Sequence, residues 1–344
     1  MIQSAKPGTV LAVVVNYNGG DLVLQCVGSL LCQTHQPLEV VVVDNASTDG
    51  SSTSIRNKFP NIKLIENSRN TGWGAACNIG MKSQASDYIV LINNDAVLDQ
   101  NCILEMVKAI ELDPKYGSCA SRVLLHDRRD RAEVCGLLIY RDGSSCARGR
   151  LGPANRYHQL EEVFCASGCC SLFRREMIDE IGTYDADFFA YGDDTDLGWR
   201  QQLAGWKCIY TPHAVAYHAH SHAAGSYSDF KGFHVERNRI LICIKNFPLS
   251  WLLLSFFYSG YRYLYQWSLS TFKKQGALAR YRERNSLLSG FAILAKAHWS
   301  AFKNFSLMWR KRREIEKIKR ISNREMARLF ERFGISTREM ASYE

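Results

Sequence analysis

Residues 88–98, YIVLINNDAVL, decide the fold that we predict for this chain. The aliphatic run that follows Tyr88 leaves no polar face for water, which is typical of a buried parallel strand. The run stops at Asn93, Asn94 and Asp95, so the Asp95 carboxylate emerges at the carboxyl end of the strand. Ligands of open α/β sheets bind at that edge, and an aspartate beside two amides can hold a hard cation through oxygen atoms. A strand-ending turn is the alternative, because Asn and Asp also favour turns.

Strands and helices alternate ahead of this segment. Apolar, β-branched runs predict three further strands, at residues 10–17, 38–43 and 62–66. Asp44 follows the second of these runs directly. The intervening stretches predict helices that end near Gln33 and Lys58, the later one with a side-chain cap within residues 47–49. This alternation predicts an α/β fold with a Rossmann-like, mixed and mainly parallel central sheet flanked by helices.

Beyond residue 114 the predicted elements become shorter. Strands are predicted at residues 117–125 and 134–140. The segment 142–155 is rich in Gly, Ser and Arg and has no periodicity, so we expect a mobile loop there. Such a loop is either a lid over a ligand or a plain surface loop.

An acidic helix start follows the aromatic run FFAY. Three carboxylates lie within its first turn, those of Asp193, Asp194 and Asp196. The free N–H groups and the macrodipole of a helix N-terminus favour negative charge, but capping accounts for one carboxylate rather than three. Further on, His218, His220 and His222 alternate, and on a strand they would share one face. We select His218 of the three as a candidate metal ligand.

The composition is that of a folded protein. The chain has 344 residues, of which 46% are hydrophobic and 22% charged, enough for one large domain or two smaller ones. Its 12 cysteines are scattered through predicted strands and helices, and we expect no secretory signal peptide, so we predict reduced and mostly buried thiols. The absence of paired CxxC spacing argues against a zinc site.

Positive charge is concentrated at the C-terminal end. Residues 273–344 contain 18 Lys or Arg and 7 Glu, a balance of +11, whereas the whole chain carries +9. The first 272 residues are therefore close to neutral, at about −2 by subtraction. This is not the uniform basic footprint of a nucleic-acid-binding protein, and we expect no nucleic-acid partner.

The region 249–272 predicts a long aromatic helix with a narrow polar stripe. The stripe recurs every three or four residues and consists of Ser255, Ser259, Arg262, Gln266, Ser270 and Lys273. A charged residue argues against a membrane-spanning helix, which needs about 20 predominantly apolar residues. We expect this region, through residue 320, to lie on a membrane surface, at a depth that suits Trp251, Tyr261, Tyr263, Tyr265 and Trp267. The alternative is a helix that packs on the protein's own core or on a second subunit of a homo-oligomer.

The strand-end and helix-start carboxylates together provide the groups that sugar transfer needs. Asp44 can accept a hydrogen bond from a pyrimidine or ribose, Asp95 can bind a metal on a diphosphate, and Asp194 can act as a base. The metal neutralises charge on the leaving diphosphate, so no general acid is required. A single base then takes the acceptor proton, and direct displacement inverts the anomeric centre. Glycosidases differ, because one of their two carboxyl groups must protonate the leaving group.

Seven motifs occur in one order along most of residues 10–245. They are VVVNYNG (13–19), VVVDNASTDGS (41–51), NTGWGAACNIG (70–80), LINNDAVL (91–98), SGCCSLFRRE (167–176), FFAYGDDTDLGWR (188–200) and AVAYH (214–218). With these motifs the chain resembles the family 2 glycosyltransferases of GT-A fold, particularly the rhamnosyltransferase-like branch. The resemblance implies a catalytic domain over residues 1–245, with a nucleotide-sugar half (1–115) and an acceptor half (116–245). A helical, basic and membrane-associated region would follow at 246–344.

The resemblance also implies roles for individual residues. Asp95 matches the last carboxylate of the DxD motif, His218 matches a histidine that can complete a site for Mg²⁺ or Mn²⁺, and Asp194 matches the catalytic base. The implied donor-nucleotide residues are Asn16, Asp44, Asn45, Asn70, Gly72, Asn78 and Asn94; those on the acceptor side are Asp193, Asp196 and Arg200. Two positions depart from the family pattern. Asn93 replaces the first DxD carboxylate, which leaves the metal with fewer charges, and Asp193 replaces the usual Glu.

The predicted activity is inverting, metal-dependent transfer of a sugar in cell-surface polysaccharide synthesis, such as that of O-antigen, by a peripheral protein at the cytoplasmic face of the cell membrane. The branch makes dTDP-L-rhamnose the first donor, and the acceptor a lipid-linked glycan or a polysaccharide. The alternative is the same chemistry with a UDP-sugar carrying galactofuranose, GlcNAc or glucose. A nucleotidyltransferase is disfavoured, because no Gly-rich loop with a basic residue follows the first strand. An inactive membrane-bound scaffold is disfavoured by Asp95, Asp194 and His218.

Overall fold

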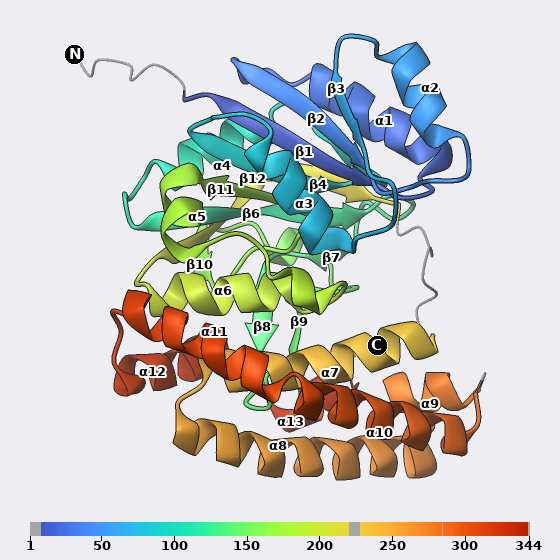
Figure 1. The fold of residues 1–344 in the computed structure, drawn as a ribbon, viewed down its shortest axis with the longest axis vertical. Coiled ribbons are helices and arrows are strands. Elements are labelled where there is room, and N and C mark those ends of the chain that lie inside the picture. Colours follow the sequence, from blue (N-terminus) through green and yellow to red (C-terminus); the bar gives the residue numbers. More distant parts are fainter. Residues whose placement is uncertain (1–7, 220–227, 284, 343–344) are drawn as a thin grey trace. The chain divides into compact units, whose positions relative to one another are not determined.

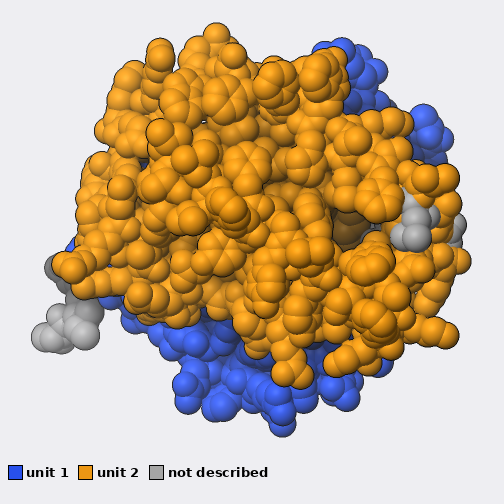
Figure 2. Space-filling model, turned by 90° about the horizontal axis from the view of Figure 1, so that it is seen from below, with its two compact units in different colours: residues 1–136, 147–189, 206–221 blue, residues 137–146, 190–205, 222–344 orange. Residues whose placement is uncertain are grey.

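The computed structural model describes residues 8–219, 228–283 and 285–342 (Figure 1). The chain forms two compact units, coloured separately in Figure 2. Unit 1 comprises residues 1–136, 147–189 and 206–221, and unit 2 comprises residues 137–146, 190–205 and 222–344. His220 and His222, two of the three alternating histidines, lie outside the described residues.

Unit 1 is built on one mixed sheet, which confirms the predicted α/β fold class. Its main path runs β10-β12-β6-β11-β4-β1-β2-β3, with β5 beside β12 and β7 beside β6 (Figure 1). The strands are β1 (Val10–Asn16), β2 (Leu38–Asp44), β3 (Lys63–Glu66), β4 (Tyr88–Asn93), β5 (Ala96–Leu98), β6 (Tyr116–Leu125), β7 (Ala132–Val134), β10 (Glu161–Val163), β11 (Cys170–Arg174) and β12 (Lys207–His218).

The register of the parallel strands brings polar residues to one edge. Strand β1 lies between β2 and β4 and runs parallel to both. Asn16 is paired with Asp44, and Val15 with Asn93. The preceding residues of β1 and β4 are almost completely buried, which explains why both strands read as uninterrupted apolar runs. The polar strand ends therefore meet at the carboxyl edge of the sheet.

The helices of unit 1 are α1 (Gly20–Leu31), α2 (Ser51–Lys58), α3 (Trp73–Lys82), α4 (Cys102–Ile110) and α5 (Arg175–Ile181). The N-cap of α2 is Gly50, in the left-handed conformation with φ 82°, and no side chain caps this helix. The side-chain cap expected within residues 47–49 is therefore wrong, although Asp49 accepts a hydrogen bond from Ser51 N (3.0 Å). All 12 cysteines lie in the described residues as free thiols, and only Cys32 is exposed.

Unit 2 is mainly helical. It contains the hairpin strands β8 (Leu137–Ile139) and β9 (Ser145–Ala147, whose last residue belongs to unit 1) and the helices α6 (Asp193–Leu203), α7 (Asp229–Asn246), α8 (Leu249–Ser268), α9 (Ala277–Arg282), α10 (Leu287–Lys303), α11 (Phe305–Ile318), α12 (Asn323–Phe333) and α13 (Thr337–Ser342). Helix α7 contacts α6, α8, α10 and α11 and so organises the unit (Figure 1). Among the described residues, no helix is long and apolar enough to cross a membrane.

Two predictions for the middle of the chain are wrong. The strand expected at 134–140 is divided into β7 and β8 around Gly136, which has φ 94° and approaches Val163 too closely for a larger residue. The start of the segment 142–155, expected to be a mobile loop, is an ordered hairpin. Asp142 in this hairpin is fully buried and paired with Arg262 (2.7 Å). A buried ion pair with a distant helix fixes a stretch whose local composition is typical of a flexible loop.

Candidate active site

The ends of β1 and β2 carry a buried polar cluster. Asn16 Nδ2 donates to Asp44 Oδ1 (2.7 Å) and to Ser51 Oγ (2.8 Å). Asn94 Nδ2, just beyond β4, donates to Asn16 Oδ1 (3.1 Å). The other oxygen of Asp44 accepts from Ser47 N (3.0 Å). These bonds hold the Asp44 carboxylate in one orientation at the carboxyl edge of the sheet, where ligands of such folds bind.

Asn45 holds the loop that precedes α3. Its Nδ2 donates to Asn70 Oδ1 (2.9 Å), and its Oδ1 accepts from Thr71 N (3.0 Å) and Asn67 Nδ2 (3.0 Å). Asn70 Oδ1 in turn accepts from Gly72 N (2.9 Å). The structure thus brings together Asn45, Asn70 and Gly72, three residues predicted to bind the donor, and shows that they shape one loop.

Gly72 and Asn78 attach the same region to residues 184–189. Gly72 has φ 87°, and a Cβ atom there would lie 2.5 Å from Phe189 O. Asn78 Nδ2 donates to Tyr184 O (2.7 Å), and Asn78 Oδ1 accepts from Tyr184 N (3.0 Å). Both ends of the Asn78 amide therefore bond to the backbone of Tyr184, which holds α3 to this segment.

A buried triad forms where β4 gives way to β5. Asp95 Oδ1 lies 2.9 Å from His218 Nε2, and Glu133 Oε2 lies 2.8 Å from His218 Nδ1. Asn93 Nδ2 is 3.5 Å from His218 Nε2. Asp95, His218 and Glu133 are each less than 10% exposed. The two residues predicted as metal ligands are therefore in direct contact.

Strand pairing explains this convergence. Strand β12 pairs antiparallel with β5, which places His218 opposite Ala96 and lets Ala219 N donate to Asp95 O (2.9 Å). On its other side β12 pairs with β6, and β6 pairs with β7, which carries Glu133. Sequence reasoning missed Glu133. Its signal was weak, a single carboxylate within the apolar stretch AEVCGLLIY.

The electrostatics of the triad favour a charged imidazole when no metal is bound. Burial acts to lower the pKa of His218, but Cys169 and the hydrogen bonds with Asp95 and Glu133 outweigh it, so the pKa lies well above its usual value. Burial also raises the pKa of Cys169 to about 12, which keeps this sulfur a neutral thiol. We therefore attribute the stabilisation of the imidazolium to the two carboxylates.

The pair Asp95 and His218 can hold a divalent cation, with Glu133 bonded to the other nitrogen of the histidine ring. Within the described ranges, no three His, Cys, Asp or Glu side chains gather to hold a metal ion, so the protein offers the pair Asp95 and His218. Their facing atoms are 2.9 Å apart, close to the roughly 3 Å between adjacent ligands of an octahedral Mg²⁺ site. A carboxylate on the other ring nitrogen is the arrangement that orients metal-binding histidines. Mg²⁺ sites of this kind are completed by water and substrate phosphates.

In unit 2, a strained turn precedes the three acidic residues. Tyr191 has φ 63° and Gly192 has φ 82°, and α6 begins at the next residue, Asp193. Asn238 on α7 donates from Nδ2 to Ala190 O (2.8 Å) and Tyr191 O (2.6 Å). A non-glycine residue in the left-handed region persists only where its surroundings hold it. Asn238, which sequence reasoning missed, thus fixes the turn that presents Asp193 and Asp194.

Asp193 is held in an unfavourable environment for a carboxylate. It is 4% exposed, and its Oδ2 has no hydrogen-bond partner among the described residues. Burial, reinforced by the charge of Asp194, raises the pKa of Asp193 to about 7. Ionised Asp193 therefore costs stability at neutral pH.

Asp193→Asn is expected to stabilise the protein at alkaline pH. The folded state binds the Asp193 proton more tightly than the unfolded state, so between about pH 4 and pH 7 the wild type loses stability as the pH rises. The uncharged variant avoids this loss, which is on the order of 4 kcal/mol above about pH 7. Urea unfolding at acid and alkaline pH measures the difference. An equal effect at both pH values, or the same pH dependence in the exposed-site control Asp179→Asn, would contradict the assignment.

Asp196 and Arg200 lie in an internal cluster. Asp196 is fully buried and accepts from Arg200 Nε (3.0 Å), Lys245 Nζ (2.8 Å) and Asn246 Nδ2 (3.0 Å). This cluster attaches α6 to α7. Direct contact of Asp196 with an acceptor would break it, so the structure favours a structural role for Asp196 and Arg200 over the predicted acceptor-side role.

Comparison with known proteins identifies the family. Residues 11–182, half of the chain, match the sequence model of glycosyl transferase family 2. The chain belongs to this family. The family 2 enzyme is 30% identical over 236 residues to the N-acetylglucosaminyl-diphospho-decaprenol L-rhamnosyltransferase of Mycobacterium tuberculosis, covering 62% of this chain and 76% of that protein. It is 24% identical over 207 residues to a poly-beta-1,6-N-acetyl-D-glucosamine synthase of Staphylococcus aureus, covering 58% of this chain and 47% of the relative.

Solved structures confirm the GT-A fold of this glycosyltransferase. The mannosyltransferase PcManGT from Pyrobaculum calidifontis, in complex with GDP-Man and Mn²⁺, aligns with a TM-score of 0.53 and 18% identity over 91% of this chain and 86% of that one. GalNAc-T7 with UDP, GalNAc and Mn²⁺ aligns with a TM-score of 0.56 and 16% identity, covering 70% of this chain and 48% of that one. At these identities the likeness concerns the fold alone.

Proposed function

We propose that this family 2 glycosyltransferase is an inverting, divalent-metal-dependent enzyme that uses a nucleotide diphosphate sugar. The observation that carries the proposal is the triad of Asp95, His218 and Glu133 in the same sheet as the Asn16–Asp44 cluster. Asp44 and Asp95 both lie at or just beyond the carboxyl ends of strands, where α/β folds bind ligands. The Mn²⁺ in the two solved structures of similar fold is consistent with the choice of Mg²⁺ or Mn²⁺.

The donor side is assigned to unit 1. Asp44 accepts a hydrogen bond from the base or ribose of the donor, while Asn16 and Asn94 keep that carboxylate in place. Asp95 and His218 would hold the cation, and Glu133 would keep the proton on His218 Nδ1 so that the Nε2 lone pair is available. A bound Mg²⁺ or Mn²⁺ neutralises the charge that develops on the leaving diphosphate.

The base is assigned to the start of α6. Asp194 accepts the proton of the acceptor hydroxyl as that oxygen attacks the anomeric carbon, which an ionised carboxylate does at neutral pH. Asp194 lies in the first turn of α6, directly after Asp193. One base and direct displacement give inversion. Asp193 next to it is the acceptor-side residue of the pair.

The names of two relatives support proposals for the substrates. The name of the Mycobacterium tuberculosis relative specifies an L-rhamnosyl group and a lipid diphosphate acceptor, which supports dTDP-L-rhamnose and a lipid-linked acceptor here. The Staphylococcus aureus relative, an N-acetylglucosamine polymer synthase, supports the alternative of a UDP-sugar and a polysaccharide. We propose a catalytic domain at 1–245 and a C-terminal region at 246–344 that holds the enzyme peripherally at the inner face of the cell membrane.

Incubation of the full chain with dTDP- and UDP-sugars tests this proposal. With Mg²⁺ or Mn²⁺ present, we expect slow hydrolysis of one donor, and we expect EDTA to abolish this hydrolysis. Binding of each nucleotide sugar is measured in parallel by calorimetry. The absence of both hydrolysis and binding across the panel would overturn the proposal in favour of an inactive scaffold.

Glu133→Gln is expected to weaken divalent-metal binding by about 10- to 100-fold. Glutamine retains the shape of the side chain but is neutral, so it no longer fixes the proton on His218 Nδ1 through an ionic hydrogen bond. Titration with Mn²⁺ followed by electron paramagnetic resonance measures the affinity without any sugar. Glu39→Gln, at an exposed position of β2, is the control. Unchanged Mn²⁺ affinity in Glu133→Gln would show that Glu133 does not position the histidine.

A further inference from the structure

Helix α8 buries most of its polar stripe and exposes a wide apolar face. The buried stripe includes Ser255, Ser259 and Arg262, each less than 10% exposed. The opposite face exposes Leu253, Phe256, Phe257, Tyr261, Leu264 and Trp267, of which Phe257 is 74% exposed. A surface helix of a soluble domain has the reverse arrangement, with its apolar stripe toward the core. The outward face of α8 is therefore suited to an apolar environment outside the chain.

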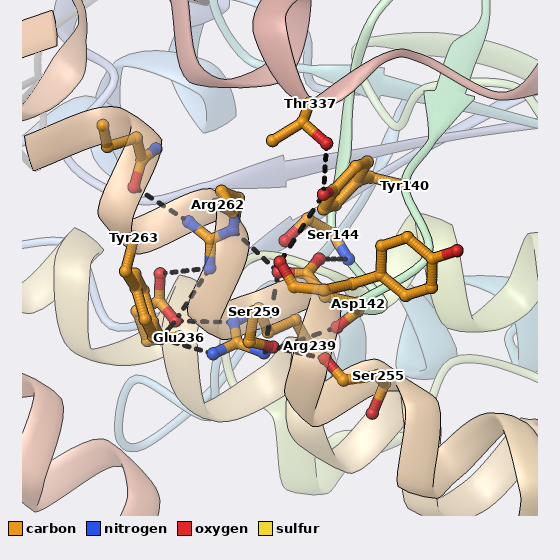
Figure 3. A network of polar contacts seen from close by, with 12 residues as sticks. Tyr140, Asp142, Ser144, Glu236, Arg239, Ser255, Ser259, Arg262, Tyr263 and Thr337 are labelled. Carbon is orange, nitrogen blue, oxygen red and sulfur yellow. Dashed lines mark hydrogen bonds and ion pairs between the residues drawn. The ribbon is translucent and has the colours of Figure 1, made fainter. Parts of the chain in front are cut away.

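A buried ionic network fixes this orientation (Figure 3). Arg262 Nε donates to Asp142 Oδ2 (2.7 Å), and Arg262 Nη2 donates to Glu236 Oε1 (3.0 Å). Arg239 on α7 donates to Glu236 Oε2 (2.6 Å) and to Ser259 Oγ (2.8 Å). Two guanidinium groups and two carboxylates balance in charge. Rotation of α8 to bury its aromatic face would separate these ions, so the apolar face stays outward.

Contacts within unit 2 correct the expected placement of three residues. Arg262 and Tyr263 were expected at the membrane surface, but Arg262 is buried and Tyr263 donates to Glu236 Oε2 (2.6 Å). Trp251, also expected there, packs against Phe330 with ring centroids 5.4 Å apart. Tyr261 and Trp267 remain on the exposed face.

The charges around this face favour an anionic surface. From residue 249 to residue 282 the sequence contains no Asp or Glu. Lys273 and Lys274 are exposed at the end of the helical stretch that continues α8, next to Phe272, which is 80% exposed. Apolar and aromatic side chains flanked by lysines are typical of segments that lie on anionic membranes. A second copy of the chain would present the same segment, which has no Asp or Glu between residues 249 and 282 to pair with these lysines.

We propose that α8 binds the interface of an anionic lipid bilayer with its outward face, while the Arg262 network holds its polar stripe on the protein. The helix lies along the membrane surface and does not cross the bilayer, because its polar stripe, which includes Arg262, is buried against the protein. This inference rests on the membrane location in the proposed function. It specifies the side chains that bind lipid, which are Leu253, Phe257, Leu264, Trp267 and Phe272 with Lys273 and Lys274.

Flotation of the full chain with vesicles tests the inference. We expect co-flotation with vesicles rich in phosphatidylglycerol and much less with pure phosphatidylcholine. Phe257→Ser combined with Leu264→Ser should reduce binding at least about tenfold, since two large apolar side chains no longer insert. Lys273→Gln combined with Lys274→Gln should remove most of the preference for anionic lipid. Leu112→Ser, at an exposed apolar position of unit 1, is the matched control and should bind like the wild type.

Two further readouts separate the outcomes. Circular dichroism and thermal unfolding establish that the variants are folded, which we expect because the substituted side chains are exposed. Donor hydrolysis without lipid reports the proposed function independently. Hydrolysis without flotation would overturn the membrane inference and leave the enzymatic proposal standing. A dimer that the Phe257 and Leu264 substitutions dissociate, together with no flotation, would overturn the inference in favour of a subunit interface.

Discussion

Asp194→Asn is expected to lower the rate of sugar transfer by about 10²- to 10⁴-fold, while donor binding is unchanged. Asparagine has nearly the shape of aspartate but cannot accept the proton of the acceptor hydroxyl. The loss should therefore appear in kcat rather than in the affinity for the nucleotide sugar. Transfer is measured with the donor that the panel identifies, and donor affinity by calorimetry.

The control for this variant is Asp179→Asn, which changes an exposed carboxylate on α5. It should transfer sugar like the wild type. Full activity of Asp194→Asn would remove Asp194 as the base. Loss of donor binding together with transfer would instead indicate a structural or donor-side role, because a residue that acts only as a base leaves donor affinity intact.

Arg262→Met is expected to destabilise the protein by about 3–5 kcal/mol. Methionine fills much of the space of the arginine stem but leaves the buried carboxylates of Asp142 and Glu236 with one guanidinium fewer. Urea unfolding at neutral pH measures the loss. Arg280→Met, at an exposed position of α9, should change the free energy of unfolding by less than about 1 kcal/mol.

The double variant Asp142→Asn with Arg262→Met tests the ionic origin of this effect. It removes one charge of each sign, so it should be more stable than Arg262→Met alone. Arg262 and Arg239 lower the pKa of Asp142 and Glu236 against the opposing effect of burial. Groups with a lowered pKa stabilise the fold above their unfolded pKa, and this contribution is lost as the pH falls below about 4. An equal loss in the single and double variants would show that packing, rather than charge, dominates.

The local sequence is sufficient to predict the strands that carry the proposed donor-binding residues. The runs before Asn16, Asp44 and Asn93 are buried on both faces, and a buried parallel strand is apolar at every position. Their polar ends could therefore be located without a structure. Asp95 was found in the same way, because it directly follows such a run.

Residues whose role depends on strand pairing could not be found in this way. Glu133 meets His218 only because β7, β6 and β12 are neighbours in the sheet, and Asn238 reaches the turn before Asp193 from the middle of another helix. The segment around Asp142 is a hairpin and not the predicted mobile loop, because Asp142 pairs with Arg262, which lies 120 residues away in the sequence. No local pattern contains such a partner.

Helix α8 has one property that can be predicted from the sequence and one that depends on contacts with the rest of the fold. The helical period alone predicts a wide aromatic face and a narrow polar stripe. The direction in which the stripe faces depends on residues from other parts of the chain. Arg262 has Asp142 and Glu236 as buried counterions, and their attraction holds the stripe inward and turns the aromatic face away from the protein.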